Sequence, residues 1–318
     1  MDKASVANPL VSVIMNCRNG EEYLREALGS IYAQSYTDWE IIFWDNASTD
    51  GSAGIAKSYG PKLRYFKSDQ CFVLGKARNL AMAEARGQYL AFLDCDDKWL
   101  PRTLEKQVGA LNNRSDIDFV YGNYFRLIMP KTGNLIPALS GQQPEGNVFG
   151  SFLYNYPVAL QTAMLRMSAV KRLDEKFDEK LGLSEEFDFF MRILLKLQAL
   201  YIDEPLAIYR IHGDMSSKKL HHMHPMEMRY ILNKLKKIDD SIELKYASEI
   251  RYYEAKLAYW QAKVHVEKHD PKSARSELAP YRFAASVFFV LYILTYLPYT
   301  AWKWLHDRKI EGKFRWIK

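Results

Sequence analysis

The sequence is poor in cysteine and lacks the marks of several common protein classes. Three cysteines among 318 residues make no disulfide framework, and their odd number fits a reducing compartment. A mean hydropathy of −0.30 excludes a protein with many membrane spans. The first ten residues hold Asp2 and no apolar stretch, so we expect no signal peptide and a cytosolic location.

Two familiar phosphate-binding motifs are also absent. The segment 51–58 has glycine and lysine at the wrong spacing for a P-loop, and no Gly-x-Gly-x-x-Gly occurs. The net charge of +6 gives no basic domain either. Seven Lys and Arg against two acids lie in residues 281–318, which leaves +1 for the first 280 residues. This distribution indicates contact with an anionic membrane surface and no nucleic-acid partner.

Short apolar runs alternate with helical patterns through the first 125 residues. They predict strands at 11–15, 40–44, 63–66, 89–93 and 119–125, and helices at 21–33, 54–59 and 76–85. Strands that alternate with helices indicate an α/β fold with a mostly parallel sheet. Prolines and glycines make residues 129–157 rich in loops. A further helix is predicted at 185–197 and a further strand at 206–211.

The remainder of the chain is expected to be helical. Mixed polar and apolar patterns predict helices at 226–238 and 242–265, and a third begins near Pro271, as in a helical hairpin. We therefore predict a domain over residues 1–215, a helical region over 216–280 and a membrane-associating segment over 281–318.

Residues 283–302 form a run of twenty without a formal charge. That length is just enough to span a bilayer, which needs about 20 apolar residues. A spanning helix would leave six Lys and Arg against two acids on the outer side, contrary to the positive-inside tendency. Tyrosines, tryptophans and a basic flank are typical of a segment lying in the interface. Interfacial attachment is the preferred interpretation; spanning, and burial against protein, are the alternatives.

Polar side chains follow three of the predicted strands. Asn16 ends the first strand, Asp45 the second, and Asp94 and Asp96 the fourth. The carboxyl ends of parallel strands meet at one edge of a sheet. Carboxylates gathered there stay ionised most easily around a cation, and hard oxygen ligands favour Mg²⁺ or Mn²⁺. Such a site predicts a phosphorylated substrate such as a nucleoside diphosphate; the alternative is that these are only turn and capping residues.

Several ordered segments resemble glycosyltransferase family 2, whose members have the GT-A fold. The resemblance lies in residues 11–24, 33–36, 39–52, 76–79 and 86–101. It covers about residues 9–215. One departure is Arg18, where the family often has an aromatic residue, and this puts base stacking at that position in doubt. The resemblance implies a GT-A domain followed by an α-helical C-terminal extension.

The resemblance also implies roles for single residues on the donor side. Asp45 would accept a hydrogen bond from the pyrimidine ring, and Asp94 would face the ribose and the metal. Asp96 would be the main ligand of Mn²⁺ or Mg²⁺ and bridge to the diphosphate. Arg78 would lie close to the nucleotide, although a salt bridge on a solvated helix is an alternative. Asn16 is placed with these nucleotide-binding residues.

Two further segments match the family's catalytic and metal-closing motifs. In segment 184–192 the position of the usual catalytic Asp is taken by Glu186, with Glu185 as the second candidate. Acids that favour a helix N-terminus are the alternative explanation. In segment 209–216, His212 would complete the metal shell or close over the diphosphate. A structural histidine is the alternative.

The implied reaction is inverting transfer from a nucleotide sugar, with UDP- or dTDP-sugars favoured, to a hydroxyl of a glycan. No Gln-x-x-Arg-Trp occurs, so one sugar per acceptor is expected. The C-terminal segment suggests a lipid-linked acceptor at the cytoplasmic face of the membrane, with peripheral or monotopic attachment. A transferase with a soluble acceptor and an inactive sugar-nucleotide-binding scaffold are the alternatives.

Overall fold

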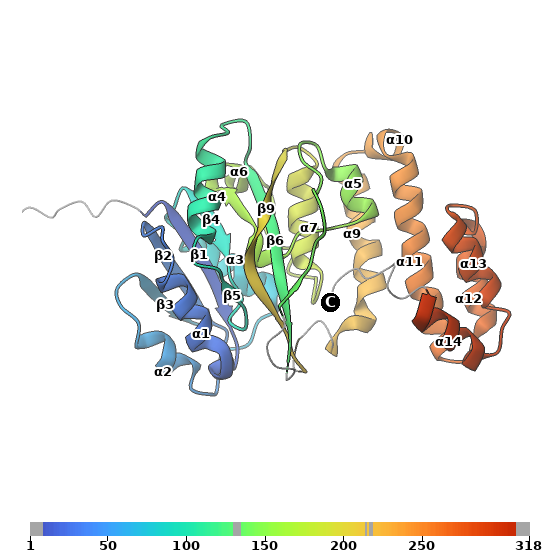
Figure 1. Cartoon of the computed structure of the whole chain (residues 1–318), viewed down its shortest axis with the longest axis horizontal. Helices are drawn as coiled ribbons and strands as arrows, with labels where there is room; N and C mark the ends of the chain where they lie inside the picture. The colour runs from blue at the N-terminus through green and yellow to red at the C-terminus, as the bar shows by residue number, and fades with distance from the viewer. Residues whose placement is uncertain (1–8, 130–134, 214, 216–218, 310–318) are drawn as a thin grey trace, which may run out of the picture. The chain divides into compact units, whose positions relative to one another are not determined.

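The computed structural model describes residues 9–129, 135–213, 215 and 219–309. Its contacts divide the chain into two compact units. Unit 1 comprises Met1–Val148 and Pro157–Gly213, and unit 2 comprises Phe149–Tyr156 and Asp214–Lys318. All nine strands of the described residues belong to unit 1 (Figure 1).

The nine strands form one sheet. They are β1 (Val11–Cys17), β2 (Trp39–Asp45), β3 (Leu63–Lys67), β4 (Tyr89–Phe92), β5 (Lys98–Trp99), β6 (Phe119–Ile128), β7 (Ile136–Pro137), β8 (Met164–Arg166) and β9 (Ala199–Ile211). The spatial order is β3-β2-β1-β4-β8-β6-β9-β5, and β7 pairs with β6. The expected α/β fold is thus confirmed.

The sheet is parallel on one side and mixed on the other. Strands β3, β2, β1 and β4 are all parallel, and β6 runs parallel to β9. Strand β8 lies antiparallel between β4 and β6, and β5 and β7 are antiparallel edge strands. Every residue of β1 is buried, as its run of apolar residues requires for a central strand covered on both faces.

The helices of unit 1 cover this sheet. They are α1 (Glu21–Tyr32), α2 (Ser52–Lys57), α3 (Leu74–Ala83), α4 (Thr103–Asn112), the short 3₁₀ turn η1 (Leu160–Thr162), α6 (Met167–Lys171) and α7 (Glu185–Leu194). Helix α1 shows why the sequence folds this way. Its buried residues Leu24, Ala27, Leu28 and Ile31 recur at helical spacing and join the core that contains Met15.

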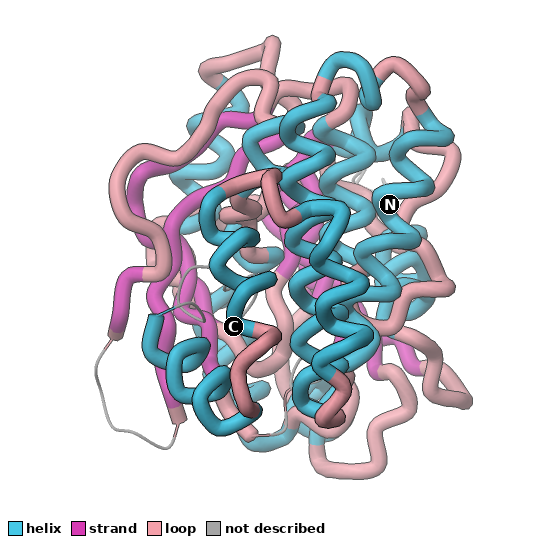
Figure 2. Tube along the Cα trace, turned by 90° about the vertical axis from the view of Figure 1, so that its right-hand side faces the viewer, coloured by secondary structure: helices cyan, strands magenta, loops and turns pink. Residues whose placement is uncertain are grey.

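Unit 2 is helical in its described residues (Figure 2, cyan). Its elements are α5 (Phe149–Tyr154), η2 (His221–Met223), α9 (His224–Ile238), α10 (Ile242–Lys245), α11 (Ala247–Glu267), α12 (Pro271–Leu278), η3 (Ala279–Tyr281), α13 (Ser286–Leu294) and α14 (Tyr299–Lys309). Helix α11 packs against α5, α9, α12 and α13. The single helix expected over 242–265 is interrupted at Tyr246, which ends α10 and precedes α11.

The apolar run 283–302 does not form one helix. It is divided between α13 and α14, with Thr295–Pro298 between them. None of the described helices has the length and apolar character to cross a bilayer. Phe288, Leu291 and Leu294 of α13, with Trp302 of α14, belong to the same core as Tyr259 of α11. Residues 310–318 of the predicted membrane-associating segment lie outside the described residues.

Candidate functional site

The polar strand ends meet as expected. Cys17, the last residue of β1, lies beside Asp45, the last residue of β2. The backbone N–H of Leu93 donates to the carbonyl of Ile14, so the chain after β4 continues alongside β1. Asp94 and the residues after it therefore leave the sheet at the same edge as the ends of β1 and β2.

Arg78 of α3 joins two of the predicted site residues. One guanidinium nitrogen donates to Glu185 Oε1 at 2.5 Å, and the other donates to Asp94 Oδ1 at 3.1 Å. The Arg78 side chain is only 3% exposed. Burial works to lower the pKa of Arg78, but the carboxylates of Asp94, Glu185 and Glu186 raise it. This buried cation holds α3, α7 and the end of β4 in one arrangement.

The carboxylates after β4 are crowded. Burial and the charge of Asp96 raise the pKa of Asp94, although Arg78 opposes the shift. Burial, and then Asp96 and Asp94, raise the pKa of Asp97 well above its usual range. One oxygen of Asp97 accepts from the backbone N–H of Arg210 at 2.8 Å. A divalent cation beside Asp94 and Asp96 would relieve the repulsion, and their oxygens suit Mg²⁺ or Mn²⁺.

Asp96 and His212 are brought together from distant parts of the sequence. His212 Nε2 lies 3.0 Å from Asp96 Oδ2, and the two side chains are 15% and 31% exposed. The ring of His212 lies 5.2 Å from that of Tyr23. The guanidinium of Arg210 lies 4.4 Å from the centre of the same tyrosine ring. Tyr23 and Arg210, which the sequence reasoning missed, therefore fix the position of His212 after β9.

Glu186 has the properties of a general base. It is half-buried. Its pKa is raised to about 8: burial raises the pKa most, Arg78 lowers it, and Glu185 and Asp94 raise it. Its charge also acts on Tyr124, whose pKa burial raises to about 12. A carboxylate that titrates near neutral pH is well matched to proton transfer.

Glu185 has a different environment from its neighbour. It is 3% exposed, and its carboxylate accepts from Arg78. A carboxylate held in a buried ion pair is a poor proton acceptor, because accepting a proton would leave the arginine without its partner. Glu185 is therefore better suited to positioning Arg78 and the start of α7 than to acting as the base.

Asp45 is fully buried and already bonded. Oδ1 accepts from the backbone N–H of Ser48 at 2.8 Å, and Oδ2 accepts from the Tyr65 hydroxyl at 2.6 Å. Burial and then Asp45 raise the pKa of Tyr65. These bonds hold the loop after β2, whose next residue, Asn46, donates to the carbonyl of Phe72 at 2.8 Å. Contact between Asp45 and a nucleotide base stays a prediction.

Asn16 offers free hydrogen-bonding capacity beside these residues. It is 7% exposed. Within the described part of the chain, neither atom of its amide has a hydrogen-bond partner. Buried amides are nearly always bonded, so an unbonded one at the end of a strand is suited to a ligand. A base or ribose that both donates and accepts would satisfy it.

A second acidic group lies elsewhere in unit 1. Ligand oxygens of Glu175, Asp178 and Asp188 all lie within 4.8 Å of one another. Arg192 donates to Asp188 at 2.7 Å and also to the carbonyl of Glu175 at 2.5 Å. An arginine thus supplies positive charge to this group. The group of Glu175, Asp178 and Asp188 does not include Asp96, the predicted metal ligand.

Comparison with known proteins gives a consistent family. Residues 12–164 match the family described as Glycosyl transferase family 2. An uncharacterized glycosyltransferase of Methanocaldococcus jannaschii is 32% identical over 210 residues, which cover 64% of this chain and 71% of that protein. An uncharacterized glycosyltransferase of Rickettsia bellii is 30% identical over 231 residues, covering 69% of this chain but only 32% of that protein. The chain therefore spans about a third of that longer relative.

One relative has a more detailed name. The Escherichia coli protein named UDP-Glc:alpha-D-GlcNAc-diphosphoundecaprenol beta-1,3-glucosyltransferase WfaP is 29% identical over 213 residues, covering 66% of this chain and 81% of that protein.

Solved structures share the fold. Residues 1–349 of S. aureus TarS, in complex with UDP-GlcNAc, align with a TM-score of 0.67 at 19% identity, covering 96% of this chain and 89% of that one. The mannosyltransferase PcManGT from Pyrobaculum calidifontis, in complex with GDP-Man and Mn²⁺, aligns with a TM-score of 0.60 at 17% identity, covering 95% and 85%. The GT-A fold expected from the sequence is confirmed.

Proposed function

Because the chain belongs to glycosyltransferase family 2, we propose that it transfers one sugar from a nucleotide-sugar donor to a hydroxyl of a growing glycan in polysaccharide assembly. The observation that carries this proposal is the meeting of Arg78, Asp94, Asp96, Glu186 and His212 at one edge of the sheet. They supply anion-binding, cation-binding and proton-accepting groups within one site.

The donor side of the reaction needs help for a departing nucleoside diphosphate. Asp94 and Asp96, with His212, would hold Mn²⁺ or Mg²⁺, which neutralises the charge that develops on the diphosphate. The imidazole favours Mn²⁺ of the two. The binding of GDP-Man and Mn²⁺ by PcManGT supports this assignment. The unbonded amide of Asn16 is suited to the nucleoside, and UDP- or dTDP-sugars are the favoured donors; TarS binds UDP-GlcNAc.

The acceptor side needs a base. Glu186 would take the proton of the acceptor hydroxyl, which then attacks the anomeric carbon from the side opposite the diphosphate and inverts its configuration. Arg78 pairs with Glu185, whereas burial and neighbouring charges bring the pKa of Glu186 to about 8, which suits Glu186 to proton transfer. The two neighbouring acids thus have separate roles, one in proton transfer and one in positioning.

The acceptor we propose is a saccharide on a lipid diphosphate. The name of WfaP specifies a diphosphoundecaprenol-linked saccharide for that relative. The missing Gln-x-x-Arg-Trp motif supports transfer of a single sugar. An acceptor of this kind places the enzyme at the cytoplasmic face of the membrane.

Donor hydrolysis tests the proposal. The full chain is incubated with a panel of UDP-, dTDP- and GDP-sugars with Mn²⁺, Mg²⁺ or chelator, and nucleotide release is measured. We expect release from one nucleotide class, lost with chelator and with Asp96→Ala. Asp116→Ala is the matched control, because Asp116 is 56% exposed and pairs with Arg114. If no donor is hydrolysed, nucleotide binding is measured by calorimetry; absence of binding refutes the proposal, and binding without turnover in the presence of acceptor supports the inactive scaffold.

A further inference from the structure

Helix α13 is apolar on both of its faces. Phe288, Leu291 and Leu294 are buried in the core of unit 2. The opposite face carries Phe289, Val290 and Ile293, which are 43%, 48% and 46% exposed. A helix that is apolar all round is normally covered on all sides. The outer face of α13 therefore lacks the polar residues expected of a helix in water.

Further exposed apolar and aromatic side chains precede and follow the helix in the sequence. Phe283 is 71% exposed and stacks on Phe289 with ring centroids 5.9 Å apart. Tyr296, Leu297 and Trp304 are 60%, 38% and 55% exposed. We call this set the outer apolar surface. Contiguous exposed apolar side chains mark interaction sites more often than scattered ones do.

Basic side chains lie beside this surface. The guanidinium of Arg282 lies 4.7 Å from the ring centre of Phe283, and that of Arg275 lies 4.6 Å from the ring centre of Tyr296. Lys303 is exposed next to Trp304. No Asp or Glu occurs in residues 278–306. Apolar and aromatic side chains flanked by Arg275, Arg282 and Lys303 complement a surface that is apolar inside and anionic at its edge.

The bend between α13 and α14 keeps this surface from becoming a spanning helix. The nine residues of α13 are about 14 Å long at 1.5 Å per residue, against about 30 Å of bilayer hydrocarbon. Arg275 donates to the carbonyl of Thr295 at 2.8 Å, and the ring of His269 lies 4.7 Å from that of Tyr299.

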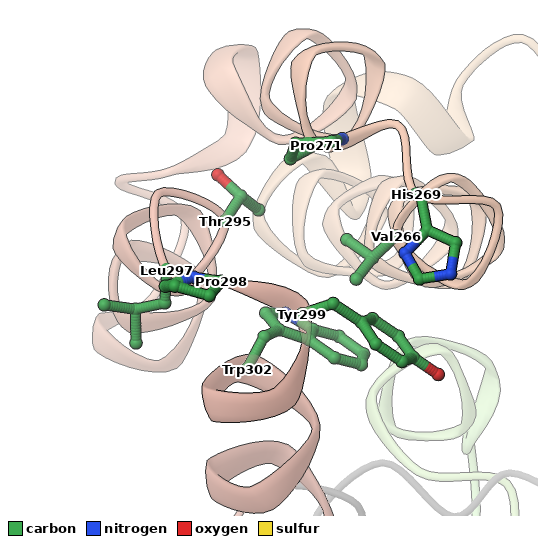
Figure 3. A pocket seen from close by; sticks show the side chains of 8 residues that line it. All are labelled: Val266, His269, Pro271, Thr295, Leu297, Pro298, Tyr299 and Trp302. Atoms are coloured by element: carbon green, nitrogen blue, oxygen red, sulfur yellow. The ribbon is translucent and has the colours of Figure 1, made fainter.

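The bend also borders a cavity within unit 2. Figure 3 shows Val266 of α11 and His269, two residues after its end, facing Thr295, Tyr299 and Trp302. The cavity that they border has a volume of about 190 Å³. The bend is thus packed against the α11–α12 turn. Straightening it into one long helix would break these contacts, so the packing opposes a single spanning helix over this run.

We propose that the outer apolar surface, residues Phe283, Phe289, Val290, Ile293, Tyr296, Leu297 and Trp304, binds the surface of an anionic lipid membrane without crossing it. The apolar side chains enter the boundary between headgroups and acyl chains, and Arg282 and Lys303 contact lipid phosphates. This inference depends on the chemistry of unit 2 alone and does not rest on the transfer reaction.

Vesicle sedimentation tests it. The full chain is mixed with vesicles of phosphatidylcholine alone or with 30% phosphatidylglycerol, and the pelleted fraction is measured. We expect strong binding to the anionic vesicles and a loss of at least about tenfold in the partition coefficient for Val290→Glu/Ile293→Glu. The matched control is Met226→Glu/Leu244→Glu, because these residues are 75% and 89% exposed in the same unit outside the surface. We expect this control to bind as the wild type does.

A charge variant and a measurement of oligomeric state complete the test. Lys303→Gln should weaken binding to anionic vesicles about fivefold and leave binding to neutral vesicles unchanged. Circular dichroism confirms that each variant is folded. The proposal is overturned if the wild type pellets with neither vesicle, or if the two glutamate double variants bind equally. It is also overturned if the wild type is a dimer that Val290→Glu/Ile293→Glu converts to monomers while vesicle binding is absent.

Discussion

The site in unit 1 buries charged side chains, whereas the outer apolar surface in unit 2 exposes apolar ones. At the site, Arg78 and Glu185 are each 3% exposed although both are charged. At the outer apolar surface, Phe283 is 71% exposed although it is apolar. The first arrangement incurs the free-energy cost of removing charges from water. The second forgoes the hydrophobic stabilisation that burial would give.

The difference shows where each unit expects a ligand. Buried charges are stable only when they are paired, and at the site Arg78 pairs with Glu185 and Asp94. The amide of Asn16 has no hydrogen-bond partner among the described residues. Exposed apolar side chains gain less from their own fold than buried ones do, so an external partner could stabilise them further. On the functions proposed above, the site receives a small polar substrate and the outer apolar surface receives a membrane.

The largest effect is expected when the base at the site is removed. Glu186→Gln should lower kcat about 10²–10⁴-fold, because an amide cannot accept the proton of the acceptor. Since the pKa of Glu186 is about 8, the wild-type rate should rise with pH and level off above that value. Steady-state kinetics between pH 6 and 9 measures both. A variant with a normal rate and the same pH profile would remove Glu186 from the mechanism.

The same carboxyl also predicts how stability depends on pH. Its pKa in the folded protein, about 8, lies above the usual value near 4.3. Between these two pH values the native state holds a proton that the unfolded state has released. This contribution is complete below about pH 4.3 and is lost as pH rises through about 8. Without metal, the wild-type Tm should therefore fall relative to that of Glu186→Gln between pH 5 and 8. Parallel curves would contradict the shift.

The next largest effect, on stability, is expected when the buried ion pairs of Arg78 are broken. Arg78→Met leaves Glu185 and Asp94 without their cation, and should lower the free energy of unfolding by about 3–5 kcal/mol. Arg102→Met is the control, because Arg102 pairs with Glu105 at 65% and 43% exposure and its loss should not be measurable. Urea denaturation compares the two. Equal effects would show that the buried pair has no special weight.

A smaller effect is expected from one added methyl group beside the site. A Cβ on Gly20 would lie 2.8 Å from the sulfur of Cys95 and 2.9 Å from that of Cys17. Gly20→Ala should therefore cost about 1–3 kcal/mol, and the cost should shrink when Cys95 is also replaced by alanine. Gly29→Ala lies within α1, the helix that Gly20 precedes; its added methyl meets nothing within 4 Å and should not destabilise. Urea denaturation of the variants measures each cost, and an unchanged cost in the double variant would exclude the clash.

The smallest effect should follow changes on the outer apolar surface. Val290→Ser/Ile293→Ser should change the free energy of unfolding by less than about 0.5 kcal/mol, because both residues already face solvent. Leu291→Ala, one residue along, is buried and should cost about 2–5 kcal/mol. Thermal unfolding of the full chain measures both. A large loss from the serine variant would show that the outer face is covered within the protein.

Much of unit 1 could be predicted because its signals are local. The apolar run of β1 and the polar residues after β1, β2 and β4 place Asn16, Asp45 and Asp94 at the ends of parallel strands by sequence order alone. The pairing of Asp96 with His212 came from motif resemblance, since the two lie far apart in the chain. Tyr23 and Arg210 lie within segments that resemble the family but were assigned no role, and Tyr65 lies outside those segments, so their contacts could be found only in the structure.

The sequence by itself determined the alternation of strands and helices and the edge of the sheet where the acidic residues gather. It also determined that residues 283–302 are apolar and are flanked by basic residues. What only the tertiary structure decided is which of these side chains pair with each other and which are buried or exposed. Arg78 selects Glu185 as its partner and so separates the two neighbouring acids. The turn at Thr295–Pro298 divides one apolar run between two helices, and packing buries one face of α13 while the other stays exposed. Both outcomes depend on contacts between residues distant in sequence, which a local pattern of residues does not encode.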